Sequence, residues 1–594
     1  MTAFIPDLNF PYPKLAYHTL LTMPSKRKRD SDEMSIERPT RPRREGVSYE
    51  LKPTTKRAVK GPALKRVAKK DRTPPPSLNP LPMPPDHPRP PRQLFVWGVG
   101  GMGQLGMGPD FLDDVAKPKL HKWCQESIQE GRFGGEGAGI ESITAGGMHS
   151  FMIDEEGKVR TCGYCSIFLF HSAAYLVTLQ VWSWGVNDDA ALGRQTKDVK
   201  DADENPVDAD ELSYTPHVVE DLVQQNFRAV QVVGGDSIGA VLSERGQLRI
   251  WGSFKVSLVS SGKSWDIPCQ SVPFQTAEGH KAFSNLRQRG DPPSKAATES
   301  FRPVELPSIK DKHFSTITCG DNHLLALTTD GHIYTWGAGE QGQVGRLVLE
   351  RHKLRGMEPE RLDIKAAVAI GAGSFHSFAI LRSGTVLAWG LNNWGQLGFE
   401  SNPRLDPRIH IQYETVDDLH PEVTGSRVVK ISGGEHHTLF LLEDGRVFAA
   451  GRCDGGQLGI ARDHPAFKLD VNKSGGGSCI YKPVEIEFGE PVADIYVASR
   501  KNLVLTRSGK LYSWGQGDLG IDDQTDEQWT PALIAGKPNA KWTCLSASIG
   551  GQHTLALFKK KVDEDRDGMD IDKPLANGAA GGMSLTNGVN GKYH

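Results

Sequence analysis

Short runs of alternating apolar and polar residues recur along most of this chain, and the runs belong to a repeated unit. One clean unit is CGDNHLLALTTDGHIYTWGAGEQGQVG at residues 319–345, and a second is GGEHHTLFLLEDGRVFAAGRCDGGQLG at residues 433–459. Each reads as a start resembling Gly-Gly-x-His, an apolar strand, a tight turn ending in Gly, a second strand, and a Gly-Gln-Leu-Gly-like end. The period of two predicts paired β-strands that bury one face.

Related starts near residues 146, 234, 371, 498 and 550 bring the number of units to seven. A single hairpin cannot cover its own apolar face, so the units must stack. Asp330-Gly331 and Asp444-Gly445 supply the positive φ that tight hairpins require. Repeats of this size with paired strands predict an all-β fold, a seven-bladed β-propeller.

The two ends of the repeat region complement each other. LFVWGVGGMGQLG at residue 94 has only the second half of a unit, and GGQHTLALF at residue 550 has only the first half. We therefore expect the N- and C-terminal strands to pair, with Phe95–Trp97 beside Leu555–Leu557, which closes the ring and leaves no open sheet edge.

Composition divides the chain into three parts. Residues 1–92 form a basic and Pro-rich N-terminal arm expected to be disordered, residues 93–560 the propeller, and residues 561–594 a disordered tail. Residues 24–72 carry 17 Lys and Arg against 7 Asp and Glu, and residues 73–92 contain ten Pro, which predicts a stiff spacer. Residues 1–22 are interpreted as an upstream leader, because Met23 begins a more natural start, MPSKRKRDSDE.

Two segments interrupt the repeat. The steps between successive Trp-Gly positions, with Ala450 in one of them, are 53 to 67 residues, except for two of 87 and 85. Removing residues 159–180 and 256–275 makes both long steps 65. Each segment begins after Lys with Val-Arg or Val-Ser and ends in Gln, residues whose codons can form intron boundaries. We interpret both as translated introns; the alternative is genuine surface loops, which propellers tolerate.

Other motifs are better explained by structure than by chemistry. Cys162 and Cys165 lack a second ligand pair at zinc spacing, and the apolar run at 167–181 is too short for a membrane span. The GxGxxG matches at 98–103 and 337–342 lack a following helix, so they predict blade turns instead of a dinucleotide site.

The remaining composition excludes further classes of function. The repeated histidines, which are His149, His323, His376 and His553, are expected to bond neighbouring backbone in turns. Eight Cys without regular spacing suit a reducing compartment. The sequence predicts no metal site, no cofactor and no bond-making catalysis.

The sevenfold repeat resembles the regulator of chromosome condensation family, and the likeness covers residues 93–560. Within that family, the basic arm before a lone propeller and the stretch WGSFK followed by TAEGHKAFS are similar to members that act as guanine-nucleotide exchange factors for the nuclear GTPase Ran. The resemblance implies catalysis by differential binding, because holding the nucleotide-free GTPase lowers the barrier to nucleotide loss.

The resemblance also implies site residues. A β-wedge that acts on the nucleotide site would comprise Phe254, Lys255, Thr276, Ala277, Glu278, Gly279 and His280. Loop residues that contact the GTPase would be Asp236, Asp321, Asn322 and His436 or His437.

Chromatin is the second implied partner. The dense cluster Lys26, Arg27, Lys28 and Arg29 suits both import through importin and contact with DNA phosphates. In the family, a loop near residues 346–361 touches histones, which makes Arg351, Lys353 and Arg355 candidates here, although an ordinary solvated loop explains them equally well.

These features predict a chromatin-bound Ran exchange factor in the nucleus that supports nucleocytoplasmic transport and mitosis, with no membrane partner. The main alternative is a propeller that serves as a protein-interaction scaffold without exchange activity, since a scaffold does not need a wedge.

Overall fold

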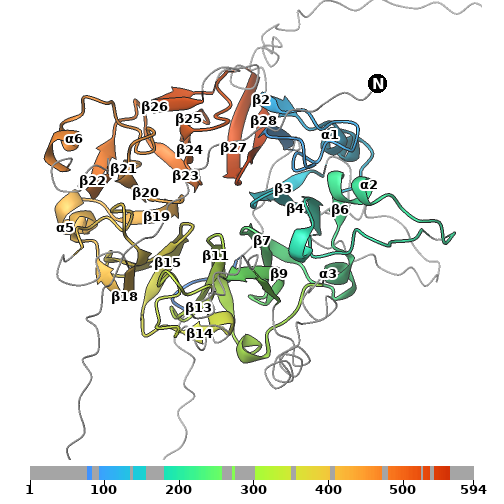
Figure 1. The fold of residues 1–594 in the computed structure, drawn as a ribbon, viewed down its shortest axis with the longest axis horizontal. Coiled ribbons are helices and arrows are strands. Elements are labelled where there is room, and N and C mark those ends of the chain that lie inside the picture. Colours follow the sequence, from blue (N-terminus) through green and yellow to red (C-terminus); the bar gives the residue numbers. More distant parts are fainter. Residues whose placement is uncertain are drawn as a thin grey trace, which may run out of the picture. The chain divides into compact units, whose positions relative to one another are not determined.

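The computed structural model of the chain describes residues 77–82, 92–133, 138–155, 180–201, 203–256, 270–273, 302–349, 356–401, 409–470, 479–522, 526–534 and 541–561. These residues form seven antiparallel four-stranded sheets around a central channel (Figure 1). The seven-bladed β-propeller predicted from the repeats is confirmed.

Six blades consist of strands that follow one another in the chain. Blades 1 to 3 contain β3 (Ile140–Ala145), β4 (His149–Asp154), β5 (Val181–Gly185) and β6 (His217–Val218); β7 (Ala229–Gly234), β8 (Ile238–Ser243), β9 (Leu248–Val256) and β10 (Gln270–Pro273); and β11 (Phe314–Cys319), β12 (His323–Thr328), β13 (Ile333–Gly337) and β14 (Glu360–Arg361). Blades 4 to 6 contain β15 (Ala367–Ala372), β16 (His376–Leu381), β17 (Val386–Leu391) and β18 (Ile409–Thr415); β19 (Val428–Gly433), β20 (His437–Leu442), β21 (Val447–Arg452) and β22 (Cys479–Ile486); and β23 (Val492–Ala498), β24 (Lys501–Thr506), β25 (Leu511–Gln516) and β26 (Glu527–Leu533).

Blade 7 joins the two ends of the folded body. It contains β27 (Trp542–Ile549), β28 (His553–Lys560), β1 (Gln93–Gly98) and β2 (Val115–Leu120). Strand β1 lies antiparallel to β28, with Phe95 opposite Ala556 and Val96 opposite Leu555. The predicted closure by the terminal strands is therefore confirmed. Hydrogen bonds between β1 and β28 join the two ends of the ring.

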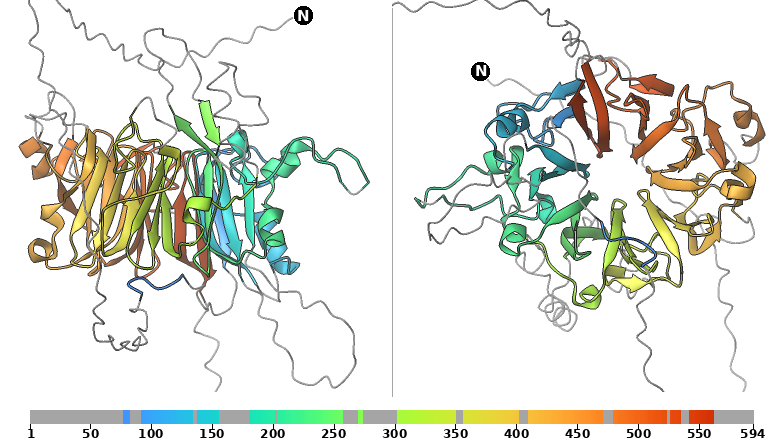
Figure 2. Two further views of the ribbon diagram at one scale, coloured as in Figure 1. Left: turned by 90° about the horizontal axis from the view of Figure 1, so that it is seen from below. Right: turned by 180° about the vertical axis from the view of Figure 1, so that it is seen from behind.

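Short helices lie in the connections before and after the outer strands, at the rim of the ring (Figure 2). They are α1 (Lys122–Gln129), α2 (Ala209–Tyr214), α3 (Glu220–Gln224), α5 (Pro421–Thr424), α6 (Pro465–Asp470) and the 3-10 turns Asp188–Ala190, Pro307–Ile309 and Asp417–Leu419. Among the described residues, no helix has the length and apolar character needed to cross a membrane.

The tryptophans of the Trp-Gly positions form the centre of the packing between blades. Their side chains have no exposed surface, and Ala450 takes the equivalent place in blade 5. These tryptophans are Trp97, Trp184, Trp251, Trp336, Trp389 and Trp514. The Gly that follows each Trp permits a close backbone approach: a Cβ on Gly337 would lie 2.6 Å from Cα of His323.

A hydrogen-bonded latch joins neighbouring blades. Between blades 3 and 4, Nε2 of His323 lies 2.8 Å from Oγ of Ser377, and this hydroxyl donates to the carbonyl oxygen of Gln343 at 2.8 Å. The indole Nε1 of Trp389 donates to the same carbonyl at 2.9 Å. Because the Ser377 proton is used on Gln343, the His323 ring must donate from Nε2.

The same latch recurs at three further blade boundaries. It consists of His376, Thr438 and Gln396 between blades 4 and 5; His437, Asn502, Gln457 and Trp514 between blades 5 and 6; and His553, Ser150, Gln104 and Trp184 between blades 7 and 1. The expectation that the repeated histidines bond backbone is wrong for His323, His376 and His553, because each reaches a side chain of the next blade.

Each Gln of the latch also shapes its own loop. The side-chain oxygen of Gln343 accepts from the backbone N–H of Gln341 at 2.9 Å, and Gln396 accepts in the same way from Trp394 at 2.9 Å. The side chain thus folds the Gly-Gln-Leu-Gly turn, and the backbone carbonyl of the same residue holds the next blade. This double role explains why Gln recurs at this position of the repeat.

The hairpin turns at the other end of each blade also contact their neighbours. Gly331 and Gly445 have φ values of 85° and 96°, which confirms the positive φ predicted for the two Asp-Gly turns. The carbonyl of Gly331 accepts from N–H of Ala367 at 3.1 Å, and that of Gly445 from N–H of Val492 at 3.0 Å. Every such bond crosses from one blade to the next.

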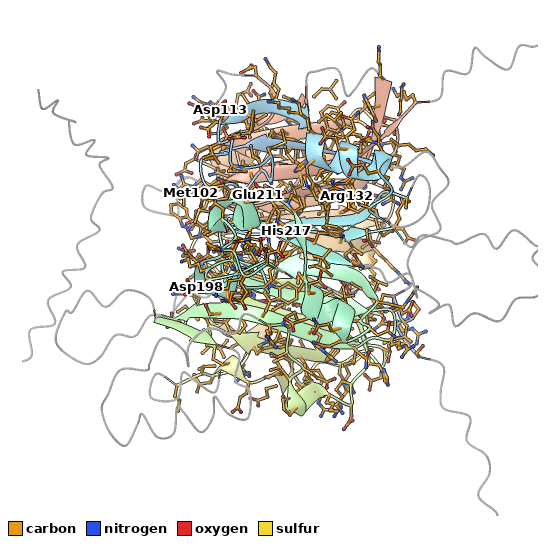
Figure 3. The ribbon with its side chains drawn as sticks, turned by 90° about the vertical axis from the view of Figure 1, so that its right-hand side faces the viewer. Met102, Asp113, Arg132, Asp198, Glu211 and His217 are labelled. Carbon is orange, nitrogen blue, oxygen red and sulfur yellow. The ribbon has the colours of Figure 1, made fainter. Side chains whose placement is uncertain are left out.

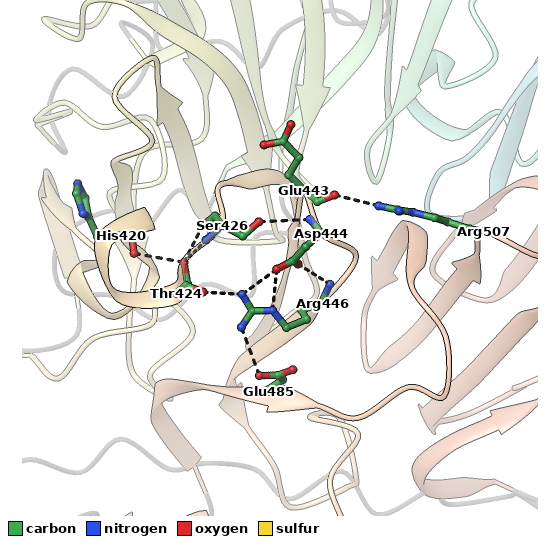
Figure 4. Close-up of polar contacts among 8 residues, drawn as sticks. All are labelled: His420, Thr424, Ser426, Glu443, Asp444, Arg446, Glu485 and Arg507. Carbon is green, nitrogen blue, oxygen red and sulfur yellow. Dashed lines mark hydrogen bonds and ion pairs between the residues drawn. The ribbon is translucent and has the colours of Figure 1, made fainter.

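Figure 4 shows how side chains reinforce the hairpin turn of blade 5. Arg446 donates from Nε to Asp444 at 2.8 Å and from Nη2 to the carbonyl of Thr424 at 2.6 Å. Arg507 of blade 6 donates to the carbonyl of Glu443 at 2.9 Å. These bonds tie the turn to its own outer loop and to the adjacent blade.

Part of the Pro-rich linker docks on this hairpin end of the ring. The buried Asn79 donates from Nδ2 to the carbonyls of Thr328 at 3.1 Å and Ala367 at 3.0 Å, which belong to blades 3 and 4. Its N–H donates to the carbonyl of Thr329 at 2.9 Å. Residues 77–82 are therefore docked on the ring, a contact that the prediction of a stiff spacer at residues 73–92 did not include.

The register of the hairpins bears on the first interruption. Five residues separate the last paired positions in the hairpins of blades 3 to 6, for example between Leu327 and Ile333. In blade 1 the corresponding pair is Ile153 and Val181, with 27 residues between them, and 27 less 5 leaves 22. This excess equals the length of residues 159–180, most of which lie outside the described residues.

Replacing a latch histidine is expected to destabilise the ring. In His376→Ala, the Thr438 hydroxyl loses the buried imidazole that joins the two blades and a cavity is left, so we expect the free energy of unfolding to fall by about 1–3 kcal/mol. Urea unfolding followed by tryptophan fluorescence measures this change. His313→Ala is the matched control, because its exposed ring makes only one hydrogen bond among the described residues, to the carbonyl of Arg245, and it should change the midpoint much less; an unchanged midpoint for His376→Ala would contradict the latch.

The latch also predicts a dependence of stability on pH. Burial lowers the pKa of His323 and His553 from 6.5 to about 3 and that of His437 to about 4, so these rings stay neutral in the folded protein. Because the unfolded chain takes up these protons first, the contribution of the histidines to stability should be full above pH 6.5 and decline as the pH falls toward 3.

One buried group acts in the opposite direction. Burial raises the pKa of Asp154 from 3.8 to about 8, so its contribution is present below pH 3.8 and is lost as the pH rises to 8. A single carboxyl reduces the slope set by several histidines but does not reverse it. Chemical unfolding at a series of pH values measures the slope, which should be smaller in His323→Gln; a pH-independent midpoint between pH 6.5 and 4 would be the opposite result.

Candidate functional site on the loop end of the ring

The loops between the first and second strands of the blades surround one mouth of the central channel. A cavity of about 510 Å³ lies there, lined by backbone of these loops and by side chains of the inner strands. Hydrogen bonds link successive loops: N–H of Gly551 to O of Gly146, Gly147 to Gly235, Asp236 to Asp321, Ser374 to Gly434 and Glu435 to Ser499, at 2.8 to 3.1 Å. The loop residues are therefore held in a fixed order around the mouth.

Three of the predicted contact residues meet on adjacent loops of blades 2 and 3. The N–H of Asp236 donates to the carbonyl of Asp321 at 2.8 Å, and both residues line the channel mouth. Asn322 follows directly, and its carbonyl accepts from N–H of Ala338 at 2.8 Å. All three are half-buried, so the structure brings these predicted residues together on one partly accessible surface.

The two neighbouring histidines of blade 5 have different roles. His437 starts β20, is buried and belongs to the latch with Asn502, so of the two alternatives only His436 is accessible for the predicted contact with a GTPase. His436 lies one residue earlier, in the loop, and is half-buried. Its Nε2 lies 3.4 Å from Glu435, and a hydrogen bond from His436 is the largest of the effects that lower the pKa of Glu435 to about 2.

A cluster of aromatic and charged residues surrounds His436, and the sequence analysis missed it. The guanidinium of Arg452 lies 4.7 Å from the ring of Trp394 and makes two hydrogen bonds of 2.7 Å to Asp454. Arg500 lies 3.6 Å from Glu435. In the sequence, Trp394 and Arg452 differ from the residues at the same positions of other repeats. Because they lie in loops of different blades, the sequence does not reveal that they are in contact.

The predicted wedge is only partly described. Strand β9 continues past Gly252, which pairs with Ile238 beside the channel loops, and residues 253–256 then pair with β10. Figure 2 shows β9 and β10 projecting beyond the neighbouring strands. In this hairpin Lys255 lies opposite Ser271. Strand β10 lies within residues 256–275, the second of the two segments interpreted as translated introns.

Phe254 requires a correction. Its side chain has no exposed surface and packs in the core cluster that contains Trp336, so it supports the base of the hairpin and cannot contact a partner. The other wedge residues, Thr276, Ala277, Glu278, Gly279 and His280, lie outside the described residues, as do Lys26, Arg27, Lys28, Arg29, Arg351, Lys353 and Arg355.

The site offers recognition chemistry. The described part of the chain contains no group of three or more His, Cys, Asp or Glu that could hold a metal ion. The stretch 98–103 forms a turn that leads to β2, as expected of a blade turn. Carboxylates on blades 2 and 3 and an aromatic and arginine cluster on blades 4 to 6 share one end of the ring, an arrangement suited to binding a protein surface.

Comparisons with known proteins agree with this architecture. The RCC1-like domain matches residues 169–556. Protein pim1 of Schizosaccharomyces pombe is 32% identical over 488 residues, which cover 82% of this chain and 76% of pim1. The guanine nucleotide exchange factor SRM1 of Saccharomyces cerevisiae is 25% identical over 497 residues, which cover 80% of this chain and 89% of SRM1.

A solved structure shows the same fold. The crystal structure of Prp20p from Saccharomyces cerevisiae, described together with its binding properties to Gsp1p and histones, superimposes with a TM-score of 0.61 at 25% sequence identity. The match covers 80% of this chain and 93% of Prp20p.

Proposed function

This chain belongs to the regulator of chromosome condensation family, which has the RCC1-like domain, and from that premise we propose that it is a guanine-nucleotide exchange factor for the nuclear GTPase Ran. The observation that carries the proposal is the loop end of the ring, where Asp236, Asp321 and Asn322 lie beside the end of β9, the strand that carries Lys255. A relative, SRM1, is named as a guanine nucleotide exchange factor.

In this proposal the ring acts by differential binding. The carboxylates of Asp236 and Asp321 accept hydrogen bonds from basic groups of the GTPase, and the predicted wedge, which begins at the end of β9, acts on its nucleotide site. Contacts that are stronger with the nucleotide-free GTPase than with the nucleotide-bound form lower the barrier to release. The chain supplies no nucleophile or acid-base pair for this process, because no covalent bond forms or breaks.

The basic arm and the chromatin contacts complete the proposal. The cluster Lys26–Arg29 serves recognition by importin and contact with DNA, and Arg351, Lys353 and Arg355 contact histones, which places the exchange reaction on chromatin in the nucleus. The binding of Prp20p to Gsp1p and histones supports this combination of partners. The excess of ten positive charges in residues 24–72 provides the electrostatic attraction.

The exchange activity can be measured as the release of labelled GDP from Ran by the full chain. Asp236→Ala should reduce kcat/KM by about tenfold, because it removes a charged hydrogen-bond acceptor from the contact surface. Asp311→Ala is the matched control, since Asp311 is exposed at the opposite end of the ring. If the chain binds Ran but does not accelerate release, the scaffold alternative is correct.

The same GDP-release assay tests whether the two segments that interrupt the repeat, residues 159–180 and 256–275, belong to the active protein. A variant lacking residues 159–180 and 256–275 should release GDP faster than the full chain, because the second segment separates Lys255 from Thr276 within the wedge. Sequencing of spliced transcripts gives an independent answer. Transcripts that retain both segments, with equal exchange rates for the two forms, would show that the segments belong to the protein.

The arm predicts a salt-dependent contact with DNA. Replacing Lys26, Arg27, Lys28 and Arg29 by Ala should reduce the slope of log K against log salt concentration by about 3 to 4, because each phosphate contact contributes about 0.9. Fluorescence anisotropy with a labelled duplex measures the slope. Lys310→Ala with Lys312→Ala, at exposed body positions, should leave it unchanged; an equal loss in both variants would remove the special role of the arm.

A further inference from the structure

Two arginines occupy the same position of the repeat but have different surroundings. Arg194 follows Trp184 by ten residues in blade 1, and Arg346 follows Trp336 by ten residues in blade 3. Both end the loop that corresponds to Gly-Gln-Leu-Gly. Because the two blades have the same arrangement of strands, the contacts of Arg346 in blade 3 can be compared position by position with those of Arg194 in blade 1.

In blade 3 the outer strand supplies a carboxylate to the arginine. Nη1 of Arg346 lies 3.1 Å from Oε2 of Glu360, and Nη2 donates to the carbonyls of Gly356 and Glu358 at 3.2 and 2.9 Å. Glu360 lies in β14 and pairs with Thr335 of β13. The charge of the largely buried guanidinium is thus neutralised within the blade.

In blade 1 the carboxylate is replaced by an imidazole. Ser183 of β5 occupies the position of Thr335, and its partner in β6 is His217, at the register position of Glu360. Arg194 donates from Nε to Oγ of Ser183 at 2.9 Å and from Nη2 to the carbonyls of Ser183 and Leu212 at 2.9 and 2.7 Å. Within the described ranges, no carboxylate lies within ion-pair distance of Arg194, and Nη1 has no acceptor.

Neither group forms an ion pair within the described residues, and His217 has only a hydrogen bond with the backbone of Glu211. Burial lowers the pKa of Arg194 to about 9. Burial, and next the charge of Arg194, lower the pKa of His217 to about 4, so the imidazole is neutral near pH 7. Its Nε2 is buried and, among the residues that the structure describes, has no hydrogen-bond partner. A buried guanidinium without a counter-ion is costly, and an anion beside it would remove that cost.

A cavity lies where the missing carboxylate would be. Its volume is about 490 Å³, which is in the range of sites for small molecules, and its walls include Arg194, His217, Trp182, Leu212, Gln195 and Gln224. Figure 3 views the side of the ring on which His217 lies, close to Glu211. Two further charged residues at the cavity are paired with each other, since Arg302 lies 3.8 Å from Asp221.

We propose that this cavity binds a small anionic molecule, whose carboxylate or phosphate group contacts Arg194 and His217 in the place that Glu360 occupies beside Arg346. The planar guanidinium suits both groups. The ring of Trp182 and the side chain of Leu212 contact the nonpolar part of the ligand, and the amides of Gln195 and Gln224 orient it. Glu220, which also lines the cavity, disfavours ligands with more than one strongly charged group.

Isothermal titration calorimetry on the full chain tests the proposal with two probes, inorganic phosphate and butyrate. We expect saturable binding of at least one probe, and the preferred probe identifies the group. Arg194→Ala should weaken binding by about tenfold or more, the loss expected for a charged hydrogen bond. Arg346→Ala is the matched control and should bind as the unmodified protein does. The absence of saturable binding with both probes would overturn the proposal.

A second variant keeps the test decisive if Arg194→Ala folds poorly. His217→Glu places a carboxylate at the register position of Glu360, so it should supply Arg194 with an internal partner, raise the thermal unfolding midpoint and abolish binding of both probes. Glu360→His in blade 3 is the converse variant and should lower the midpoint. If His217→Glu binds the probes as tightly as the unmodified chain, the cavity is not an anion site.

Discussion

The latch between neighbouring blades is the interaction on which the rest of the structure depends. A hairpin of this repeat cannot cover its own apolar face, so each blade is stable only against the next. The latch fixes how two neighbouring blades are placed relative to each other, because His323, Ser377 and Gln343 can form their hydrogen bonds in only one relative position. The His of the Gly-Gly-x-His start, the Trp of the Trp-Gly position and the Gln of the Gly-Gln-Leu-Gly end are far apart within one unit. They come together at the boundary between blades 3 and 4, as His323, Trp389 and Gln343.

The latch also fixes the functional end of the ring. The histidine begins the second strand immediately after the channel loop, so the bond that holds the blades also holds the loop. Asp321 lies in a loop held in this way, and Asp236, whose blade has Ile238 in place of the latch histidine, is positioned by its backbone hydrogen bond to Asp321. Such a preorganised surface loses little conformational entropy when a partner binds.

Two blades have another residue in place of the latch histidine, and one of them carries the projecting hairpin. In blade 2 the latch histidine is replaced by Ile238, and this is the blade whose third strand continues into the projecting hairpin. In blade 6 the position holds Lys501, whose pKa burial lowers to about 8. Exceptions to the local rules of a fold are expected at functional positions, where other demands override them.

The sequence was informative where the physics is local and repeated. Alternation, Asp-Gly turns and the two half-units predicted the blades and the closure of β1 on β28. It could not separate His436 from His437, since only the first residue of β20 decides which ring is buried. It also placed Phe254 at a surface, because the pattern does not show that this side chain packs beside Trp336. The neighbourhood of Arg194 was equally hidden, since its partners come from separate elements and are recognised only by comparing blades.

The docked linker has a mechanical consequence. Asn79 is bonded to blades 3 and 4, and the chain reaches β1 of blade 7 only after this point. Tension applied to the chain before residue 77 is therefore borne first by these bonds. The pulling force acts on blades 3 and 4 through Asn79. Strand β1, which closes the ring by pairing with β28, therefore does not bear the force directly.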